Sequence, residues 1–290
     1  MSYVEQEIAS QPECWRRALD LEPAGLPERG ERVAVIGCGT SLYIAQAYAA
    51  LRETAGLGET DAFAASEYPA DRRYDRLVAI SRSGTTTEVL AALARAGHTP
   101  AVALTGDLDT PITTAADTVV GLEFADERSV VQTRFATTAL ALLRGHLGLA
   151  PADLPEQADR ALAGPLPEGA VTAGQFTFVG TGWTVGLANE AALKLREASG
   201  SWTESYPAME YRHGPISIAA PGRVVWFFGA PPAGLADEVR SIGAVTSVTT
   251  LDPLADLVRA QRLAVALAEA HGLDPDRPRN LTRSIVLAQP

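Results

Sequence analysis

The stretch Val35-Ile-Gly-Cys-Gly-Thr-Ser-Leu-Tyr-Ile-Ala45 returns in the second half of the chain as Phe178-Val-Gly-Thr-Gly-Trp-Thr-Val-Gly-Leu-Ala188. Both copies have an apolar run, a Gly-x-Gly turn and a helical pattern, in register over eleven positions. A short apolar strand that leads through glycines into a helix is typical of a parallel α/β sheet. The match indicates an internal duplication and predicts two similar α/β domains.

Around both copies, apolar strands alternate with helices. The expected strands are residues 33–36, 77–80, 101–104, 224–229 and 245–249, and the expected helices are residues 41–53, 86–95, 133–149 and 253–271. Short strands that are almost wholly apolar indicate parallel sheets covered on both faces by helices. The pattern therefore predicts paired, doubly wound α/β domains.

Composition and the positions of proline- and glycine-rich stretches suggest four segments. Residues 1–32 are expected to form a leader with an amphipathic helix over residues 3–21, and residues 33–150 the first domain. Residues 151–173, rich in Pro, Ala and Gly, are expected to form a linker, and residues 174–290 a second domain that ends in a tail.

Composition also excludes several classes of function. Of 290 residues, 47% are hydrophobic and 20% charged, which is typical of a soluble globular protein. The net charge of -11 argues against nucleic acid and anionic membranes as partners, because basic side chains bind both. We find no long apolar run or signal peptide and expect a cytoplasmic protein. Cys14 and Cys38 lack metal-ligand spacing and are expected to be free thiols, so no metal is predicted.

The strongest sign of a ligand site is Ile80-Ser-Arg-Ser-Gly-Thr-Thr-Thr-Glu88, between an expected strand and an expected helix. Backbone N–H groups and the helix dipole favour an anion at such a junction. Five hydroxyl side chains in seven residues add donors, so the loop predicts a phosphate site. Arg82 could add charge and Glu88 could cap the helix. An ordinary Ser/Thr-rich turn is the alternative.

A second candidate, Gly37-Cys-Gly-Thr-Ser41, also joins a strand to a helix. It offers Thr40 and Ser41 to the carboxyl edge of the sheet, where ligands bind in open α/β folds. The segment lacks the third glycine of a dinucleotide fingerprint, and no acidic residue ends the second strand at the expected offset. We therefore expect no nicotinamide cofactor. A purely structural turn is the alternative.

Lys194 is the only lysine among 24 basic residues. Its survival in an arginine-rich chain suggests a need for a compact ammonium that can exchange a proton, although chance is the alternative. Glu190, Lys194 and Glu197 fall on one helix face, which by itself is also typical of a solvated salt-bridge ladder. Glu197 lies near the helix C-terminus, where the dipole favours a protonated carboxyl, so it is a candidate general base.

The remaining candidate is His213, in Tyr211-Arg-His-Gly-Pro215. This turn should present the imidazole to a cleft, although a lone histidine often has only a structural role. The other three histidines are expected to be helix caps or surface residues.

Together with the tail Asp274-Pro-Asp-Arg-Pro-Arg-Asn-Leu-Thr-Arg-Ser284, these motifs resemble the sugar isomerase (SIS) domain family. The resemblance is to the isomerase half of glucosamine-fructose-6-phosphate aminotransferase and its stand-alone relatives, over about residues 33–290. Five motifs occur in the family's order, and Glu197 and His213 keep its separation of sixteen residues. The resemblance implies two tandem flavodoxin-like α/β/α sandwich domains with parallel sheets, which bind a hexose 6-phosphate and pair as homodimers.

The resemblance also implies roles for single residues. Phosphate contacts would come from Ser41, Ser81, Ser83 and Thr86, and Cys38 and Thr40 would lie near the sugar. Glu197 matches the carboxylate that moves a proton between C1 and C2, with Lys194 as its assisting lysine. His213 matches the imidazole that opens the sugar ring, which in such dimers can come from the neighbouring subunit.

Departures from the family pattern restrict the function. Ser2 stands where the aminotransferase has its glutaminase cysteine, so we expect no glutamine amidotransferase. Arg283 replaces the lysine that forms a Schiff base, and a guanidinium cannot form that imine, although it could anchor the sugar or its phosphate. Gln132-Thr-Arg134 replaces the family's Ser-Thr-Lys, so Gln132 is a candidate contact of the sugar.

The sequence thus predicts a cofactor-independent enzyme that acts on an amino sugar 6-phosphate, either glucosamine 6-phosphate or its N-acetyl derivative. Isomerisation with deamination is the first expectation. Elimination of the C3 hydroxyl, a dehydration, is the second and suits an acetylated nitrogen. A sugar-phosphate sensing module is the non-enzymatic alternative, although retention of Glu197, Lys194 and His213 together favours turnover.

Overall fold

The computed structural model describes residues 1–287, which fall into two compact units. Unit 1 comprises Met1–Pro12, Ser129–Thr133 and Pro151–Leu281, and unit 2 comprises Glu13–Arg128, Arg134–Ala150 and the described residues from Thr282 on. The last three residues of the predicted tail, 288–290, lie outside the described residues. The boundaries expected at residues 33, 150 and 174 stay predictions.

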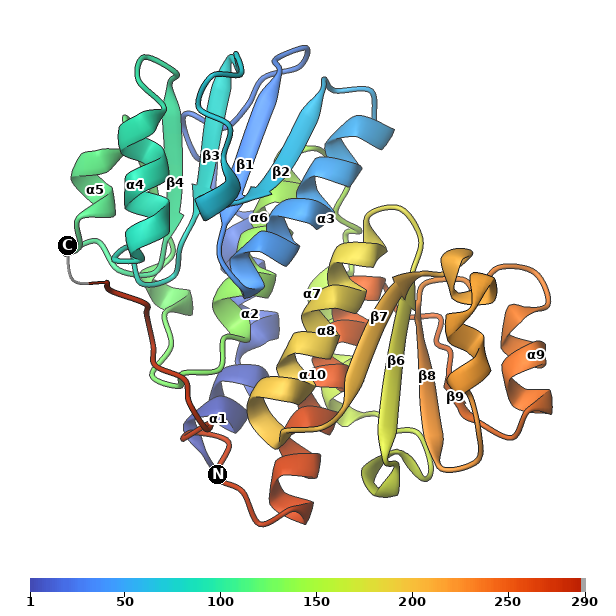
Figure 1. Cartoon of the computed structure of the whole chain (residues 1–290). Helices are drawn as coiled ribbons and strands as arrows, with labels where there is room; N and C mark the ends of the chain where they lie inside the picture. The colour runs from blue at the N-terminus through green and yellow to red at the C-terminus, as the bar shows by residue number, and fades with distance from the viewer. Residues whose placement is uncertain (288–290) are drawn as a thin grey trace. The chain divides into compact units, whose positions relative to one another are not determined.

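Unit 2 contains a parallel five-stranded sheet of order β2-β1-β3-β4-β5 (Figure 1). Its strands are β1 (Val33–Gly37), β2 (Thr60–Ala64), β3 (Arg76–Ile80), β4 (Ala101–Thr105) and β5 (Thr118–Gly121). Its helices are most of α2 (Gln11–Leu19), then α3 (Thr40–Thr54), α4 (Thr87–Arg95), α5 (Ile112–Ala115) and α6 (Arg134–His146). Helix α3 packs against α6, and α4 packs against α5.

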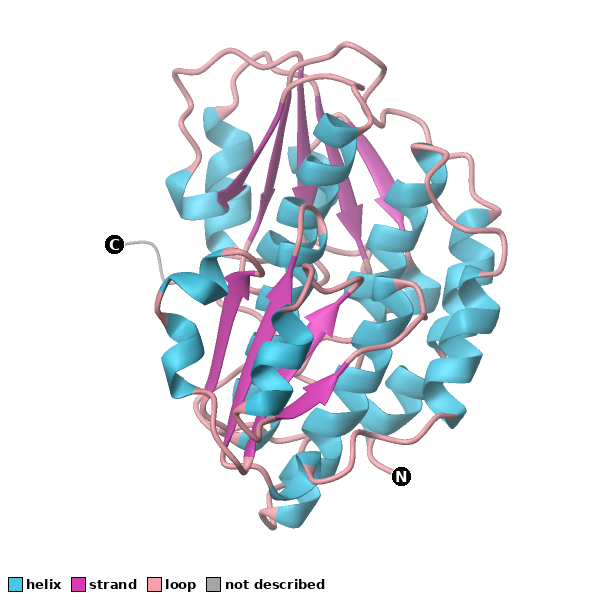
Figure 2. Ribbon diagram, turned by 90° about the vertical axis from the view of Figure 1, so that its right-hand side faces the viewer, coloured by secondary structure: helices cyan, strands magenta, loops and turns pink. Residues whose placement is uncertain are grey.

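Unit 1 contains a parallel four-stranded sheet of order β7-β6-β8-β9. Its strands are β6 (Gln175–Gly180), β7 (Thr203–Pro207), β8 (Arg223–Phe228) and β9 (Val245–Ser247). Its helices are α1 (Tyr3–Ala9), α7 (Leu154–Ala163), α8 (Thr184–Ser199), α9 (Leu235–Ser241) and α10 (Pro253–Ala270). Helix α10 packs against α7 and α8, and helices flank the strands of each sheet in Figure 2.

Strand alternation explains why both faces of the first sheet are covered. Ala34, Ile36, Leu77 and Ala79 form one apolar cluster with Val89 and neighbouring residues of α4. The intervening residues, such as Val35 and Val78, are also fully buried, so the central strands have no solvent face. This double burial is the reason for their continuous apolar sequences.

The duplication predicted from sequence is visible in the topology. In each unit the first strand lies between the second and the third, which is the flavodoxin-like order. A Cβ atom on Gly37 would lie 2.5 Å from the carbonyl carbon of Ser41, and one on Gly180 would lie 2.3 Å from the carbonyl oxygen of Thr184. Both turns therefore need glycine, because the strand end approaches the first turn of the next helix. The two-domain α/β fold is confirmed.

Several element predictions were incomplete. The leading helix expected over residues 3–21 is two helices, because Pro12 lacks an N–H group and its ring would clash with the carbonyl of Ile8 in a continuous helix. Strands β2, β5 and β7 were missed. They are edge strands that are only partly buried, so they lack the continuous apolar run of a central strand.

Part of the expected linker forms α7. Within residues 1–287, no helix is both long enough and apolar enough to cross a membrane. The cytoplasmic location stays a prediction.

Candidate functional site

The predicted phosphate loop, residues 81–86, leaves β3 and enters α4 at the carboxyl edge of the sheet of unit 2. Ser83 is buried, and its Oγ atom lies 3.5 Å from Oγ1 of Thr86, the N-cap residue of α4. Gly84 has φ +61°, and a Cβ atom there would lie 2.0 Å from Oγ1 of Thr110. Glycine thus lets the loop turn tightly and keeps the hydroxyls together at the start of the helix.

Strand β1 is hydrogen-bonded to β3, so the two strand ends meet at the same sheet edge. Thr40 and Ser41 follow β1 in the first turn of α3, and both are buried. The structure of unit 2 therefore brings the two predicted hydroxyl segments together. Their position beside adjacent strand ends is the usual ligand position in open α/β sheets.

Cys38 and Glu88 lie beside this edge. Burial, followed by the negative charge of Glu88, raises the pKa of the Cys38 thiol, so the group stays neutral at physiological pH. Glu88 was expected to cap α4, yet among the described residues its Oε2 atom is buried and makes no hydrogen bond. Glu88 does lie in the first turn of α4, so its expected capping role stays a prediction.

The guanidinium group of Arg82 contacts other residues of unit 2. Its Nη1 atom lies 3.5 Å from Oε2 of Glu127, and neither side chain is more than 1% exposed. Its Nη2 atom donates to the carbonyl oxygen of Arg283 at 2.9 Å. Arg82 was expected to add charge to the phosphate site, but here it mainly fixes the loop to Glu127 and to the tail. Sequence reasoning missed Glu127, because no local pattern pairs two residues 45 positions apart.

The tail continues along the same loop. The hydroxyl of Ser83 donates to Oγ of Ser284 at 3.1 Å, and the N–H of Thr87 donates to the carbonyl oxygen of Ile285 at 3.2 Å. Arg283 was expected to contact the sugar or its phosphate. Instead, its guanidinium donates to both carboxylate oxygens of Asp126 at 2.6 and 2.8 Å.

Unit 1 holds the proton-transfer candidates on α8. The Nζ atom of Lys194 donates a short hydrogen bond to Oε2 of Glu197 and lies 3.6 Å from Oε1 of Glu190. The exposed fractions of the three side chains are 1% for Lys194, 0% for Glu190 and 19% for Glu197. The solvated-ladder alternative is therefore wrong, because two of the three charges are buried.

Glu197 is the accessible member of this trio. It lies in the last turn of α8, which ends at Gly200 in the left-handed conformation. With Arg196, His271 and Arg277, it lines a polar cavity of about 360 Å³ within unit 1. A carboxylate that contacts a buried ammonium and reaches open space can exchange protons with a bound molecule.

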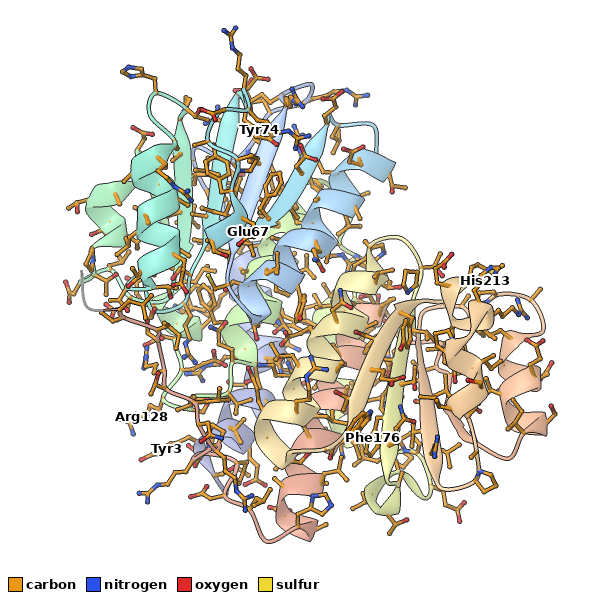
Figure 3. All side chains as sticks on the ribbon, in the orientation of Figure 1. Tyr3, Glu67, Tyr74, Arg128, Phe176 and His213 are labelled. Carbon is orange, nitrogen blue, oxygen red and sulfur yellow. The ribbon has the colours of Figure 1, made fainter. Side chains whose placement is uncertain are left out.

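His213 and Gln132 also belong to unit 1. The imidazole of His213 is exposed at the end of a short 3-10 helix, Glu210–His213, as Figure 3 shows. Arg212 holds this helix by donating to Glu238 at 2.9 Å. The amide oxygen of Gln132 is buried, and within residues 1–287 it accepts no hydrogen bond, so it can accept one from a ligand.

No family model matches the chain. Glutamine–fructose-6-phosphate aminotransferase of Aeropyrum pernix is 28% identical over 92% of this chain and 53% of that protein. The chain thus spans about half the length of the curated relatives it matches. The structure of glucosamine-6-phosphate deaminase from Thermotoga maritima matches 99% of this chain and 100% of its own, with a TM-score of 0.83 and 23% identity.

The C-terminal domain of glucosamine-fructose-6-phosphate aminotransferase from Francisella tularensis matches 96% of this chain and 98% of its own, with a TM-score of 0.78 and 20% identity. The chain thus resembles proteins of the sugar isomerase (SIS) domain family in sequence and in fold.

The candidate residues fall into two groups. Unit 2 carries the hydroxyl loops, with Cys38, Arg82 and Arg283 around them, and unit 1 carries Lys194, Glu197, His213 and Gln132. The residues predicted to bind an anion and those predicted to transfer a proton thus lie in different units.

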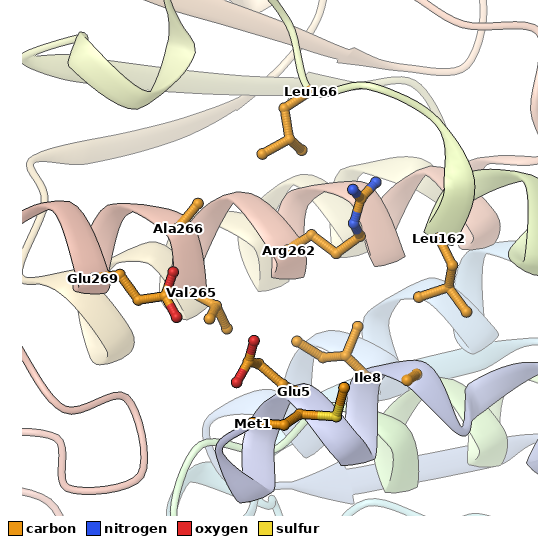
Figure 4. A pocket seen from close by; sticks show the side chains of 10 residues that line it. Met1, Glu5, Ile8, Leu162, Leu166, Arg262, Val265, Ala266 and Glu269 are labelled. Carbon is orange, nitrogen blue, oxygen red and sulfur yellow. The ribbon is translucent and has the colours of Figure 1, made fainter.

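Among the described residues, no group of His, Cys, Asp and Glu could hold a metal ion. Figure 4 shows a cavity of about 290 Å³ lined by residues of α1, α7 and α10, including Ile8, Leu162 and Val265. Its walls are mainly apolar, and none of the candidate residues lines it.

Proposed function

We propose that this protein is a cofactor-independent enzyme that isomerises a hexose 6-phosphate, with amino sugar 6-phosphates as its substrate class. The observation that carries the proposal is the contact between Glu197 and Lys194. A partly exposed carboxylate beside a buried ammonium suits the removal of a proton next to a carbonyl group.

Each step has a candidate group in the chain. The hydroxyls of Ser41, Ser81, Ser83 and Thr86 bind the phosphate, and His213 moves the proton that opens the ring. Glu197 then takes the proton from C2 and returns it to C1, while Lys194 stabilises the negative charge of the enol-type intermediate. We also propose a homodimer in which His213 comes from the neighbouring subunit, in keeping with its exposed position.

The nitrogen at C2 decides the net reaction. When it is a free amine, return of the proton to C1 leaves an imine at C2. Water then adds to that imine and ammonia leaves, which gives the ketose phosphate. The names of two similar proteins, a glucosamine-6-phosphate deaminase and an aminotransferase, support this substrate class.

Arg283 also supports this direction of reaction. Its guanidinium cannot form an imine with a ketose, and it is bound to Asp126. The chain therefore lacks the lysine through which the resemblance implies that a ketose is captured for amination. Release of ammonia from an amino sugar needs no such imine with the protein.

The test is incubation of the chain with glucosamine 6-phosphate, N-acetylglucosamine 6-phosphate or fructose 6-phosphate in D2O, followed by NMR. We expect deuterium at C1 or C2 and ammonium from glucosamine 6-phosphate. Loss of the C3 hydroxyl from the acetylated sugar would instead establish dehydration. If no sugar exchanges deuterium or forms product although one of them binds, the chain is a sensing module and the proposal is wrong.

A further inference from the structure

The buried carboxylate of Glu190 has no task in the reaction described above. It lies one helical turn before Lys194 on α8, and Glu197 lies one turn after it. The Oε1 atom of Glu190 is 3.6 Å from Nζ of Lys194, and the two side chains are 0% and 1% exposed. The ammonium therefore lies between an inaccessible carboxylate and an accessible one.

This arrangement matters because the charge of Glu197 changes during proton transfer. A buried ammonium without a counter-charge is unfavourable, and breaking a buried ion pair is strongly destabilising. Glu197 loses its negative charge whenever it carries the substrate's proton. If Glu197 were its sole counter-charge, Lys194 would then become a buried and uncompensated cation.

Glu190 supplies a charge that stays in place. Because its side chain is inaccessible, it cannot take the proton from a bound sugar. Resting on the proposed function, we propose that Glu190 is a positioning residue that keeps Lys194 charged and in place while Glu197 carries the proton.

Several charged groups on the elements packed against α8 contact groups outside that helix. On α10, Asp256 pairs with Arg259 at 2.7 Å and Arg262 donates to the carbonyl of Ala161. On β7, Glu204 accepts from Tyr206. On β8, Arg223 donates to the carbonyl of Ile218. Around the polar cavity beside Glu197, the charged or titratable groups are Arg196, His271, Asp274, Arg277 and Arg279.

The chain's single lysine permits a direct test. Lysine labelled with 15N at Nζ gives one side-chain signal, which reports the charge of Lys194 without any need for turnover. In Glu190→Gln we expect Lys194 to lose its proton at lower pH than in the wild type, because one stabilising carboxylate is gone. Glu190→Asp keeps the charge, so we expect it to restore most of the wild-type titration.

Kinetics provide the second measurement. For Glu190→Gln we expect kcat to fall about tenfold with KM almost unchanged, because a displaced or neutral Lys194 stabilises the enol-type intermediate less without weakening phosphate binding.

Asp256→Asn is the matched control. It removes another buried carboxylate that pairs with a basic residue, and we expect it to lower stability without changing kcat or the Lys194 signal. An unshifted Lys194 signal in Glu190→Gln, or equal behaviour of the Gln and Asp variants, would overturn the proposal. An inactive wild-type chain whose Lys194 signal still responds to Glu190→Gln would refute the proposed function and leave the coupling of the two residues intact.

Discussion

Arg283 and Asp126 lie 157 residues apart in the sequence, yet one guanidinium nitrogen of Arg283 contacts both carboxylate oxygens of Asp126 at 2.6 and 2.8 Å. Another nitrogen of the same guanidinium donates to the carbonyl of Glu127. These contacts hold the tail on the phosphate loop within unit 2. Arg283 is therefore a tether of the tail.

Replacing Arg283 with alanine should loosen the tail. We expect amide hydrogen exchange at Thr87, whose N–H donates to Ile285, to accelerate about fivefold, which corresponds to the loss of about 1 kcal/mol from a partly exposed ion pair. Arg277→Ala is the control, since Arg277 is 88% exposed and lies 3.9 Å from Asp274. Equal exchange at Thr87 in both variants would show that the pair does not hold the tail.

The role of Glu197 predicts a loss of catalysis without a loss of binding. In Glu197→Gln we expect kcat to fall about 10²- to 10⁴-fold, because general-base catalysis contributes that factor, with KM changed little. Glu204→Gln is the control, since Glu204 also lies in unit 1 and accepts only from Tyr206 among the contacts described above. Wild-type turnover in Glu197→Gln would remove this residue from the mechanism.

The predicted phosphate loop should affect binding of the ligand. In Ser83→Ala we expect inorganic phosphate to bind about ten- to a hundredfold more weakly by calorimetry, since a hydrogen bond to a charged group contributes about 1.5–3 kcal/mol. The control is Thr114→Ala, which removes a hydroxyl that donates to the carbonyl of Pro111 outside the loop. Unchanged phosphate affinity in Ser83→Ala would favour an ordinary Ser/Thr-rich turn.

Asp256 predicts a pH dependence of stability. Burial raises its pKa from 3.8 to about 6, despite the opposing charge of Arg259. The folded chain therefore binds this proton more tightly than the unfolded chain, so the free energy of unfolding falls as pH rises from about 4 to about 6. The loss from this group is up to about 3 kcal/mol.

The Asp256→Asn variant should lack this pH-dependent change in the free energy of unfolding. We expect the difference in the free energy of unfolding between wild type and Asp256→Asn to decrease across the same pH range in urea titrations. A difference that is constant between pH 4 and 7 would contradict the raised pKa of Asp256.

The paired turns predict equal effects in both units. In Gly37→Ala and Gly180→Ala we expect the free energy of unfolding to fall by about 1–3 kcal/mol, because the added Cβ atom would meet helix backbone at 2.5 and 2.3 Å. Gly174→Ala is the control, since nothing lies within 4 Å of a Cβ atom there. A tolerated change at Gly37 or Gly180 would mean that the strand and helix can separate easily.

Local sequence patterns predicted the strands whose own residues show that both faces are buried. The strands at residues 33–36 and 77–80 were found because both of their faces are buried and need apolar residues throughout. The edge strand Thr60–Ala64 was missed because it is only partly buried and its sequence contains Thr60 and Asp61. An edge strand is defined by its neighbour, which the strand's own sequence does not specify.

For the candidate site residues too, the sequence predicted local features but not those that depend on distant segments. Glu190, Lys194 and Glu197 could be placed on one helix face from their spacing, because a helix brings residues three and four apart together. Their burial could not be predicted, since it depends on the elements that pack against α8. The sequence did not reveal the ion pair of Arg82 for the same reason, because Glu127 is not close to it in the sequence.

The sequence by itself determined the duplication, the parallel α/β architecture, the hydroxyl-rich loop and the singular position of Lys194. These features depend on periodicity, turn chemistry and residue identity over a few turns of chain. Only the tertiary structure decided that Lys194 is buried between two carboxylates, that Arg82 pairs with Glu127 and that Arg283 ties the tail to Asp126. Burial and long-range ion pairing decide how a charge behaves, and both arise when distant segments pack together.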